Sequence, residues 1–273
     1  MDLLVFDLDG TLLNSAEVLS PLTLDTLSEL ASRDVLYTIA TGRTRQSAEP
    51  ALVGHTFELP QAYKNGVVIW DPSEQRYTDH HFLPLTDVRK IAELTTECDL
   101  TPFVFAIEAN NEHSVFHGPL NGPYDMLLAQ DIRKRAALNF LPLELLSDRT
   151  RATNVSALGT PESIDALVSA VREIDHWVAY SNTAIEDGSL KWIDIHRAEA
   201  SKGNAVLRLK RDLGASRVLC FGDSFNDSSM FEVADECYAT SNAKRPLREA
   251  ATAVIGHHDE DGVARFLRER YGL

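Results

Sequence analysis

Residues 2–13 read DLLVFDLDGTLL, and the interpretation of the whole chain starts from this stretch. The apolar run from Leu3 to Phe6 is too short to cross a membrane but suits a buried parallel strand. Asp7 and Asp9 follow it two positions apart, so an extended chain directs both carboxylates to the same side. Gly10 and Thr11 then turn the chain. A buried strand that ends in two acids indicates a cation site.

Two less specific interpretations fit parts of this stretch. A strand followed by an Asp-Gly turn occurs in many α/β proteins. A glycosyltransferase-type DxD metal clamp also has two acids at this spacing, although it is not expected at the first strand of a chain. The rest of the sequence has to separate these possibilities.

Length and charge limit the classes of function. With 273 residues, 44% of them apolar and 25% charged, the chain can form two moderate hydrophobic cores. Asp and Glu number 41 against 26 Lys and Arg, which gives a formal net charge of −15 and no basic patch. This charge argues against nucleic acid and anionic membranes as partners. A small phosphate ester remains possible where a divalent metal reverses the local charge.

The cysteines and the N-terminus indicate a compartment. Cys98, Cys220 and Cys237 are odd in number, far apart and without CxxC spacing, which favours buried thiols in a reducing environment. The chain enters its first strand without a basic region, an apolar leader helix or a cleavage site. We therefore expect a cytoplasmic protein.

The chain begins and ends with an α/β rhythm. Helical spacing over residues 21–32 lies between the first strand and a second one at residues 35–40, which predicts a right-handed parallel crossover. Residues 67–70 and 76–82 flank Asp71-Pro72-Ser73-Glu74, and this pattern predicts an antiparallel hairpin. After a helix at residues 202–213, a buried strand at residues 217–221 resumes the parallel sheet. Ligands of such sheets gather at the carboxyl ends of the strands.

The middle of the chain has a different pattern. Helices near residues 86–97, 124–135 and 161–174 alternate with short strands near residues 103–108, 114–116, 155–158 and 177–180. Residues 192–195 are expected to lead back to the first domain. The predicted fold class is therefore α/β, with a Rossmann-like parallel-sheet core at residues 1–82 and 191–273 and an inserted α+β cap domain at residues 83–190.

Four polar clusters follow strand ends or begin a helix: Asp7 with Asp9, then Thr41, then Lys202, then Gly222-Asp223-Ser224-Phe225-Asn226-Asp227. Each alone fits an ordinary turn or helix start. Their order resembles the four motifs of the haloacid dehalogenase (HAD) superfamily of phosphoryl-transfer enzymes. The insertion between the second and third motifs, together with sequences such as Ser201-Lys202-Gly203-Asn204-Ala205, resembles the Cof-type phosphatase subfamily. One departure is His196-Arg197-Ala198-Glu199-Ala200, where relatives commonly have a turn containing Pro or Gly.

The resemblance implies a role for each motif. Asp7 is the expected nucleophile and a ligand of Mg²⁺, and it forms an aspartyl-phosphate. Asp9 offers its backbone carbonyl to the metal, and its side chain is the general acid and base. Asp223 completes the metal shell, and Asp227 coordinates through water or orients other groups. Phosphate is expected to contact Thr41, Gly42, Lys202 and Asn226, with Arg43 and Asn65 as further substrate-binding candidates. For Arg43 and Asn65, structural hydrogen bonding of their loops is an equally open interpretation.

The predicted function is a magnesium-dependent phosphatase for a small phosphate monoester, a sugar phosphate or related metabolite. A sugar phosphomutase and a non-catalytic phosphate-binding or regulatory protein are the alternatives. The sequence does not define the substrate or the oligomeric state. Adjacent histidines at 80–81 and 257–258 are interpreted as structural and not as metal ligands. Polar residues on expected cap turns are Glu108, Asn110, Asn111, His113 and Asp187.

Overall fold

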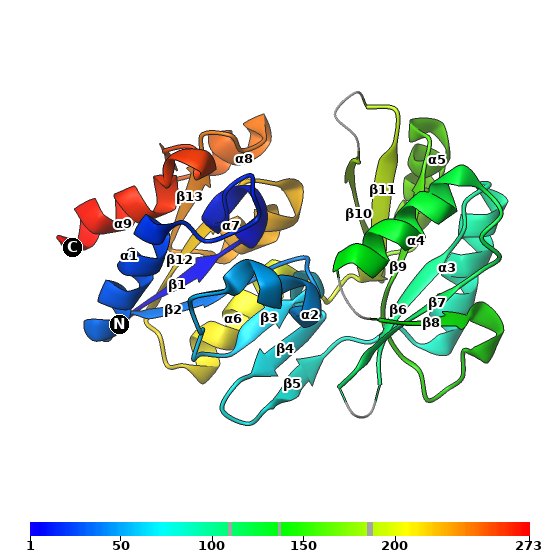
Figure 1. Ribbon diagram of the computed structural model, residues 1–273, viewed down its shortest axis with the longest axis horizontal. Helices are drawn as coiled ribbons and strands as arrows, with labels where there is room; N and C mark the ends of the chain where they lie inside the picture. The colour runs from blue at the N-terminus through cyan, green and yellow to red at the C-terminus, as the bar shows by residue number, and fades with distance from the viewer. Residues whose placement is uncertain (109–110, 136–137, 185–187) are drawn as a thin grey trace. The chain divides into compact units, whose positions relative to one another are not determined.

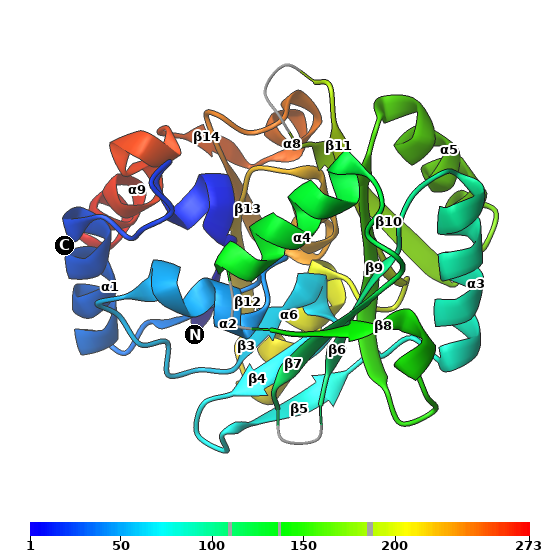
Figure 2. The same ribbon diagram turned by 45° about the vertical axis from the view of Figure 1, so that its right-hand side comes forward.

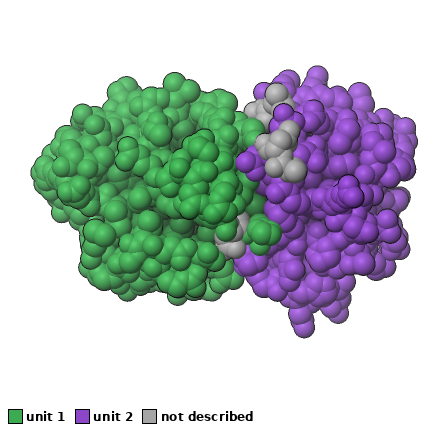
Figure 3. All heavy atoms as spheres, turned by 90° about the horizontal axis from the view of Figure 1, so that it is seen from below, with its two compact units in different colours: residues 1–80, 200–273 green, residues 81–199 purple. Residues whose placement is uncertain are grey.

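The computed structural model describes residues 1–108, 111–135, 138–184 and 188–273. They divide into two compact units, one formed by Met1–His80 with Ala200–Leu273 and the other by His81–Glu199 (Figure 3). The chain therefore leaves the first unit and later returns to it. Each unit has its own sheets and its own hydrophobic core.

The first unit is built on a five-stranded parallel sheet with the order β14-β13-β12-β1-β2 (Figure 1). The predicted opening strand is β1, and it lies between β12 and β2 with residues 3–6 fully buried. Burial of each large apolar side chain stabilises the fold by roughly 1.5–3 kcal/mol, which explains why so short a strand is central. The strands of this sheet are β1 (Asp2–Phe6), β2 (Leu36–Ile39), β12 (Arg217–Gly222), β13 (Glu236–Thr240) and β14 (Ala253–Ile255).

Helices cover both faces of this sheet. Leu3 and Val5 pack into a core with α6 and α7, whereas Phe6 contacts Phe221, whose ring also meets Phe266 of α9 on the opposite face (Figure 1). The alternation of side chains along a strand thus fills both layers. The helices of this unit are α1 (Pro21–Ser32), α2 (Arg45–Ala48), α6 (Lys202–Asp212), α7 (Ser228–Val233), α8 (Arg245–Ala250) and α9 (Gly262–Tyr271).

A small antiparallel sheet completes the first unit. Its strands are β3 (Gln61–Tyr63), β4 (Val68–Asp71) and β5 (Arg76–His80). The pairing of β4 with β5 confirms the predicted hairpin. Ala62 also bridges to Ala40 at the end of β2, which brings the loop after β3 to the carboxyl edge of the parallel sheet.

The second unit is a six-stranded sheet with helices on both faces (Figure 2). Helices α3 (Leu85–Glu97) and α5 (Pro161–Arg172) pack on one face, and α4 (Pro123–Arg135) packs against Phe103 and Val115 on the other. The strand order is β10-β11-β9-β6-β7-β8. The strands are β6 (Phe103–Ile107), β7 (His113–His117), β8 (Asn139–Pro142), β9 (Arg151–Gly159), β10 (Trp177–Thr183) and β11 (Lys191–Arg197).

The end of this unit differs from the sequence expectation. Residues 192–195 do not lead back to the first unit, because β11 pairs along its whole length with β10 and also with β9. The second unit therefore extends to Glu199, where the expected boundary was residue 190. Strand pairing, which involves residues far along the chain, decides the unit to which this apolar run belongs.

Candidate active site

The site is centred on a buried lysine between two carboxylates. Asp7 follows β1 directly, Lys202 is the first residue of α6, and Asp227 precedes α7. Lys202 Nζ donates to Asp7 Oδ1 at 2.5 Å and to Asp227 Oδ1 at 2.6 Å, and the lysine side chain is fully buried. Three residues that are far apart in the sequence thus form one hydrogen-bonded group.

Lys202 reaches this position although residues 196–200, which precede it, lack the expected turn containing Pro or Gly. Ser201 has an extended backbone, and its hydroxyl caps α6 by accepting from the amide of Asn204 at 3.1 Å. A serine at this position satisfies one of the free amides of the first helical turn. The departure at residues 196–200 therefore does not prevent Lys202 from entering the site.

The charges of the group do not balance. Burial alone would lower the pKa of Lys202, but the charges of Asp227 and Asp7 outweigh it and raise that pKa, so the lysine stays protonated. Burial also raises the pKa of Asp7, and the charges of Asp227 and Asp223 add to this effect against the opposing Lys202. One ammonium group thus faces three carboxylates, and a further cation would offset the surplus negative charge.

The oxygens of Asp7, Asp223 and Asp227 form a possible cation site. One oxygen of each lies within 4.8 Å of one oxygen of each of the others. Asp227 Oδ2 already accepts from the amides of Asp223 and Ser224, both at 2.9 Å, whereas burial and the nearby Asp227 raise the pKa of Asp223 to about 7. Carboxylate oxygens are the ligands that Mg²⁺ prefers, and a cation would favour the ionised form of Asp223. The donor set therefore fits a divalent metal, with Asp227 also bracing the loop.

A glycine allows the chain to turn directly after the two acids of the opening stretch. Gly10 has a φ of +74°, and a Cβ there would lie 2.6 Å from Asp223 Oδ2. Its carbonyl accepts from Thr240 Oγ1 at 3.0 Å and from Asn242 Nδ2 at 2.8 Å. Both the left-handed backbone and the close carboxylate require the missing side chain. The turn is thereby fixed beside Asp223.

Thr41 lies at the carboxyl end of β2 and is fully buried. Its hydroxyl accepts from the amide of Arg43 at 3.1 Å, which leaves the hydroxyl proton available to a ligand. The carbonyl of Thr41 accepts from the amide of Asn65 at 2.9 Å, and Asn65 Oδ1 accepts from Asn226 Nδ2 at 2.9 Å. A Cβ on Gly42 would lie 3.2 Å from that same Asn65 oxygen. Asn65 and Asn226 therefore join the second and fourth sequence motifs.

Arg43 has several protein partners. Its guanidinium donates to both oxygens of Asp9, at 2.8 and 2.5 Å, to Glu17 Oε2 at 2.7 Å and to the carbonyl of Ser47 at 3.0 Å. Burial favours its neutral form, but hydrogen bonds and charges of Asp9 and Glu17 outweigh burial and raise the pKa of Arg43. Arg43 is predicted from the sequence to bind substrate, and here it holds Asp9.

Sequence reasoning missed Glu17. It lies in a polar loop between the opening stretch and α1, and no motif includes it. An acidic residue shortly after Asp9 was the one available signal, and it is not specific. Its contact with Arg43 depends on the packing of the loop and not on a sequence pattern.

A second cluster of possible ligand atoms has a structural explanation. His257, His258 and Asp259 lie close enough to share a cation. However, the His257 ring accepts from the Asp259 amide at 3.2 Å, His258 Nδ1 lies 2.9 Å from the carbonyl of Leu13, and Asp259 accepts from the amide and hydroxyl of Ser15. These contacts join the segment before α9 to the loop after residue 13, and the structural interpretation of the two histidines stays a prediction.

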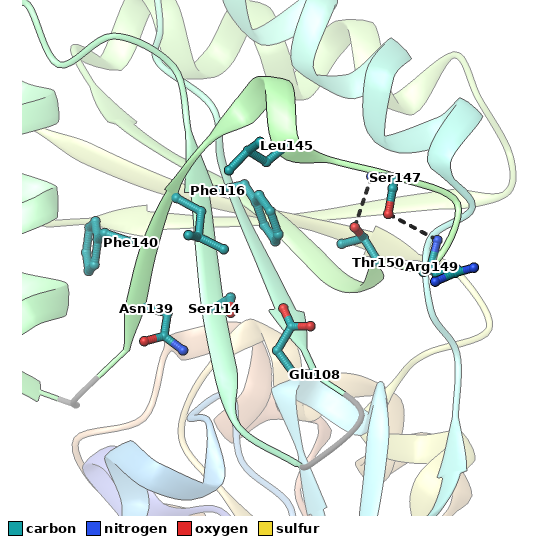
Figure 4. A pocket seen from close by; sticks show the side chains of 10 residues that line it. Glu108, Ser114, Phe116, Asn139, Phe140, Leu145, Ser147, Arg149 and Thr150 are labelled. Atoms are coloured by element: carbon teal, nitrogen blue, oxygen red, sulfur yellow. Dashed lines mark hydrogen bonds between the residues drawn. The ribbon is translucent and has the colours of Figure 1, made fainter.

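The second unit contains a separate cavity of about 410 Å³ (Figure 4). Glu108, one of the polar cap residues noted from the sequence, lines it together with Ser114 and Phe116, and no residue of the carboxylate site does. Asn110 and Asp187 lie outside the described residues. Among the helices of the described residues, none is long and apolar enough to cross a bilayer.

Comparisons with known proteins agree with the fold and the order of the motifs. A family model described as haloacid dehalogenase-like hydrolase matches residues 4–267. The chain is 24% identical to pyridoxal phosphate phosphatase YbhA of Escherichia coli (strain K12), over 97% of this chain and 96% of that protein. It is 25% identical to the 5-amino-6-(5-phospho-D-ribitylamino)uracil phosphatase YitU of Bacillus subtilis (strain 168), over 99% of this chain and 98% of that protein.

A solved structure agrees as well. A haloacid dehalogenase-like hydrolase from B. subtilis superposes with a TM-score of 0.81 at 22% identity, over 98% of this chain and 99% of that chain. This likeness concerns the fold, and the family match spans nearly the whole sequence, including all four motifs. The chain therefore belongs to the haloacid dehalogenase-like hydrolases.

Proposed function

We propose that the protein is a magnesium-dependent phosphatase that hydrolyses a small phosphate monoester through an aspartyl-phosphate at Asp7. The observation that carries this proposal is the buried group in which Lys202 bridges Asp7 and Asp227 next to Asp223. A phosphate monoester repels an anionic nucleophile, and such a site needs fixed positive charge and an aligned carboxylate. Lys202 and a bound cation supply that charge.

In the first step, a carboxylate oxygen of Asp7 attacks phosphorus while the bond from phosphorus to the leaving oxygen breaks. Asp9 gives a proton to that oxygen. In the second step, water attacks the phosphorus of the aspartyl-phosphate, Asp9 takes a proton from the water, and Asp7 is released with inorganic phosphate. The second step thus returns to Asp9 the proton that the first step used, and it restores the free carboxylate of Asp7.

The remaining motif residues bind and orient the phosphoryl group. The Thr41 hydroxyl and the Gly42 amide donate to its oxygens, and Lys202 neutralises charge that it shares with Asp7. Asn65 and Asn226 hold the two loops beside it. Asp7 and Asp223 would hold Mg²⁺ together with the backbone carbonyl of Asp9, with Asp227 oriented next to them. The metal would neutralise negative charge on the carboxylates and on the phosphate.

The proposed substrate is a small phosphorylated metabolite, a sugar phosphate or a related compound. The named activities of the two similar proteins, on pyridoxal phosphate and on a phosphoribityl compound, support this class. The net charge of −15 supports a small ligand over nucleic acid or a membrane surface. Cys220 and Cys237 face each other on neighbouring strands as free thiols, which supports a cytoplasmic location.

The test is phosphate release from ribose phosphate, hexose phosphate, glycerol phosphate, pyridoxal phosphate and para-nitrophenyl phosphate, with and without Mg²⁺. We expect turnover that requires Mg²⁺ and is reversibly lost with a chelator. Asp7→Asn should abolish turnover and retain the fold by circular dichroism. Full activity of Asp7→Asn or of the chelated enzyme would overturn the proposal, and formation of an isomeric phosphate ester would indicate a phosphomutase.

A further inference from the structure

The loop after the opening stretch forms a turn that presents Glu17. Asn14 Oδ1 accepts from the backbone amides two and four residues further on, at 3.0 and 3.3 Å, and the Asn14 carbonyl accepts from the Glu17 amide at 2.8 Å. Glu17 has a φ of +57°, in the left-handed region. This conformation costs a non-glycine residue roughly 1–2 kcal/mol, so other contacts must offset it.

The turn is also held from outside. Ser15 donates its amide and its hydroxyl to the two oxygens of Asp259, at 2.7 and 2.6 Å. Asp259 belongs to the segment that leads into α9. These contacts hold the backbone of the turn from which the Glu17 side chain extends.

The Glu17 carboxylate accepts from the guanidinium of Arg43. The two N–H groups of Nη2 are divided between Asp9 Oδ1 and Glu17 Oε2, while Nε binds the second oxygen of Asp9. The Arg43 side chain is 11% exposed, and those of Asp9 and Glu17 are 52% and 50% exposed. One largely buried cation thus joins two acids that face solvent.

A general acid needs a fixed direction. An exposed aspartate on a turn has several rotamers, and a misplacement of 1 Å can cost about 10²-fold in rate. The two-point contact with Arg43 fixes the plane of the Asp9 carboxylate. Arg43 has a long flexible stem, and Glu17 with the Ser47 carbonyl holds its far end.

We propose that Glu17 is a positioning residue for the proton transfers of Asp9, because it anchors the guanidinium of Arg43 that orients the Asp9 carboxylate. This inference rests on the proposed function, in which Asp9 protonates the leaving oxygen. Alkyl phosphates need that proton, whereas para-nitrophenolate leaves readily without it. A loss of Asp9 orientation therefore slows the formation of the aspartyl-phosphate from the two kinds of substrate to different degrees.

The experiment compares Glu17→Ala and Glu17→Gln with the wild type on para-nitrophenyl phosphate and on the fastest alkyl monoester of the panel above. We expect kcat/KM for the alkyl monoester, which reports formation of the aspartyl-phosphate, to fall about 10-fold in Glu17→Ala, less than the roughly 10²- to 10⁴-fold that general acid–base catalysis contributes. The kcat/KM for para-nitrophenyl phosphate should change less than about twofold, because its leaving group needs no proton. The kcat values also include hydrolysis of the aspartyl-phosphate, for which Asp9 is the base with either substrate, so they do not separate the two substrates. Glu17→Gln keeps an oxygen acceptor and should lie between the wild type and Glu17→Ala.

The matched control is Glu49→Ala. Glu49 pairs with Arg45 at 2.8 Å, and its side chain is 55% exposed, close to the value for Glu17, but it does not contact Arg43. It should leave both substrates unaffected.

Three results would overturn the inference: an equal loss of kcat/KM on both substrates, unchanged kcat/KM in both Glu17 variants, or a higher kcat/KM for the alkyl monoester. If the wild type releases no phosphate from any substrate with Mg²⁺, the proposed function itself has failed. Circular dichroism of both variants separates loss of fold from loss of orientation, and Glu17→Gln retains the size of the native side chain.

Discussion

Replacement of Lys202 by methionine is a demanding test of the buried group. Methionine keeps an unbranched apolar stem but removes the ammonium that donates to Asp7 and Asp227, whose carboxylates then face each other in a buried site. Removal of one partner from a buried ion pair costs about 3–5 kcal/mol, because the other charge is left unpaired. We expect the free energy of unfolding of Lys202→Met to fall by about this amount near neutral pH.

The same variant should respond strongly to pH. Burial and the neighbouring acids already raise the pKa of Asp7 in the wild type, and loss of the opposing lysine raises it further. The folded variant then binds more protons than the unfolded chain, so its stability should rise as the pH falls from about 8 to about 5. Each additional bound proton corresponds to about 1.4 kcal/mol per pH unit, and the wild type should show a smaller slope.

The assay is urea unfolding followed by circular dichroism in chelator at several pH values. The control is Lys210→Met on the same helix, which removes an exposed pair with Asp235 at 2.8 Å and should cost no more than about 1 kcal/mol. If Lys202→Met is destabilised no more than Lys210→Met and shows no steeper pH dependence, the bridging role of Lys202 is refuted.

Two further predictions concern the metal and the backbone. The pKa of Asp223 is raised to about 7 without metal, and Mg²⁺ requires the ionised carboxylate, so the apparent Mg²⁺ affinity measured by calorimetry should increase from about pH 5 to about pH 8. Asp223→Asn should abolish binding, and an affinity that is independent of pH would contradict this assignment. Gly66→Ala should destabilise the protein by several kcal/mol more than Gly214→Ala in urea unfolding. Both glycines have positive φ, but a Cβ on Gly66 would lie 2.3 Å from the Ser201 carbonyl oxygen, whereas a Cβ on Gly214 meets nothing within 4 Å. Equal losses of stability would show that the close approach at Gly66 carries no energy.

The sequence predicted the core of the fold because local signals agreed there. Residues 2–13 combine a buried apolar run with two acids and a turn, and the strand pairs with β12 and β2. The parallel edge then brings together Asp7, Thr41 and Asp223, as expected from strands that end at one side of a sheet. The proximity of these three loops was predictable, because it follows from the order and direction of the strands alone.

The errors and omissions depend on contacts between distant residues. Strand β11 was assigned to the first domain because its apolar run does not reveal its partners, which are β9 and β10. Strand β8 was missed because it is short, lies at the edge of its sheet and ends in Pro142. The contact of Arg43 with Glu17 was missed, since the turn that presents Glu17 has no sequence signature, and the substrate-binding role of Arg43 stays a prediction.

The central claim is that Asp7 carries the phosphoryl group. Asp9→Asn should slow hydrolysis of the intermediate, because it removes the base for the attacking water while leaving Asp7 and Lys202 intact. After this variant reacts with para-nitrophenyl phosphate and Mg²⁺ and is quenched in acid, peptide mass spectrometry should find one phosphoryl group on the peptide that contains Asp7. It should be absent when Asp7→Asn is added. A phosphoryl group on another residue, or none during turnover, would contradict the account.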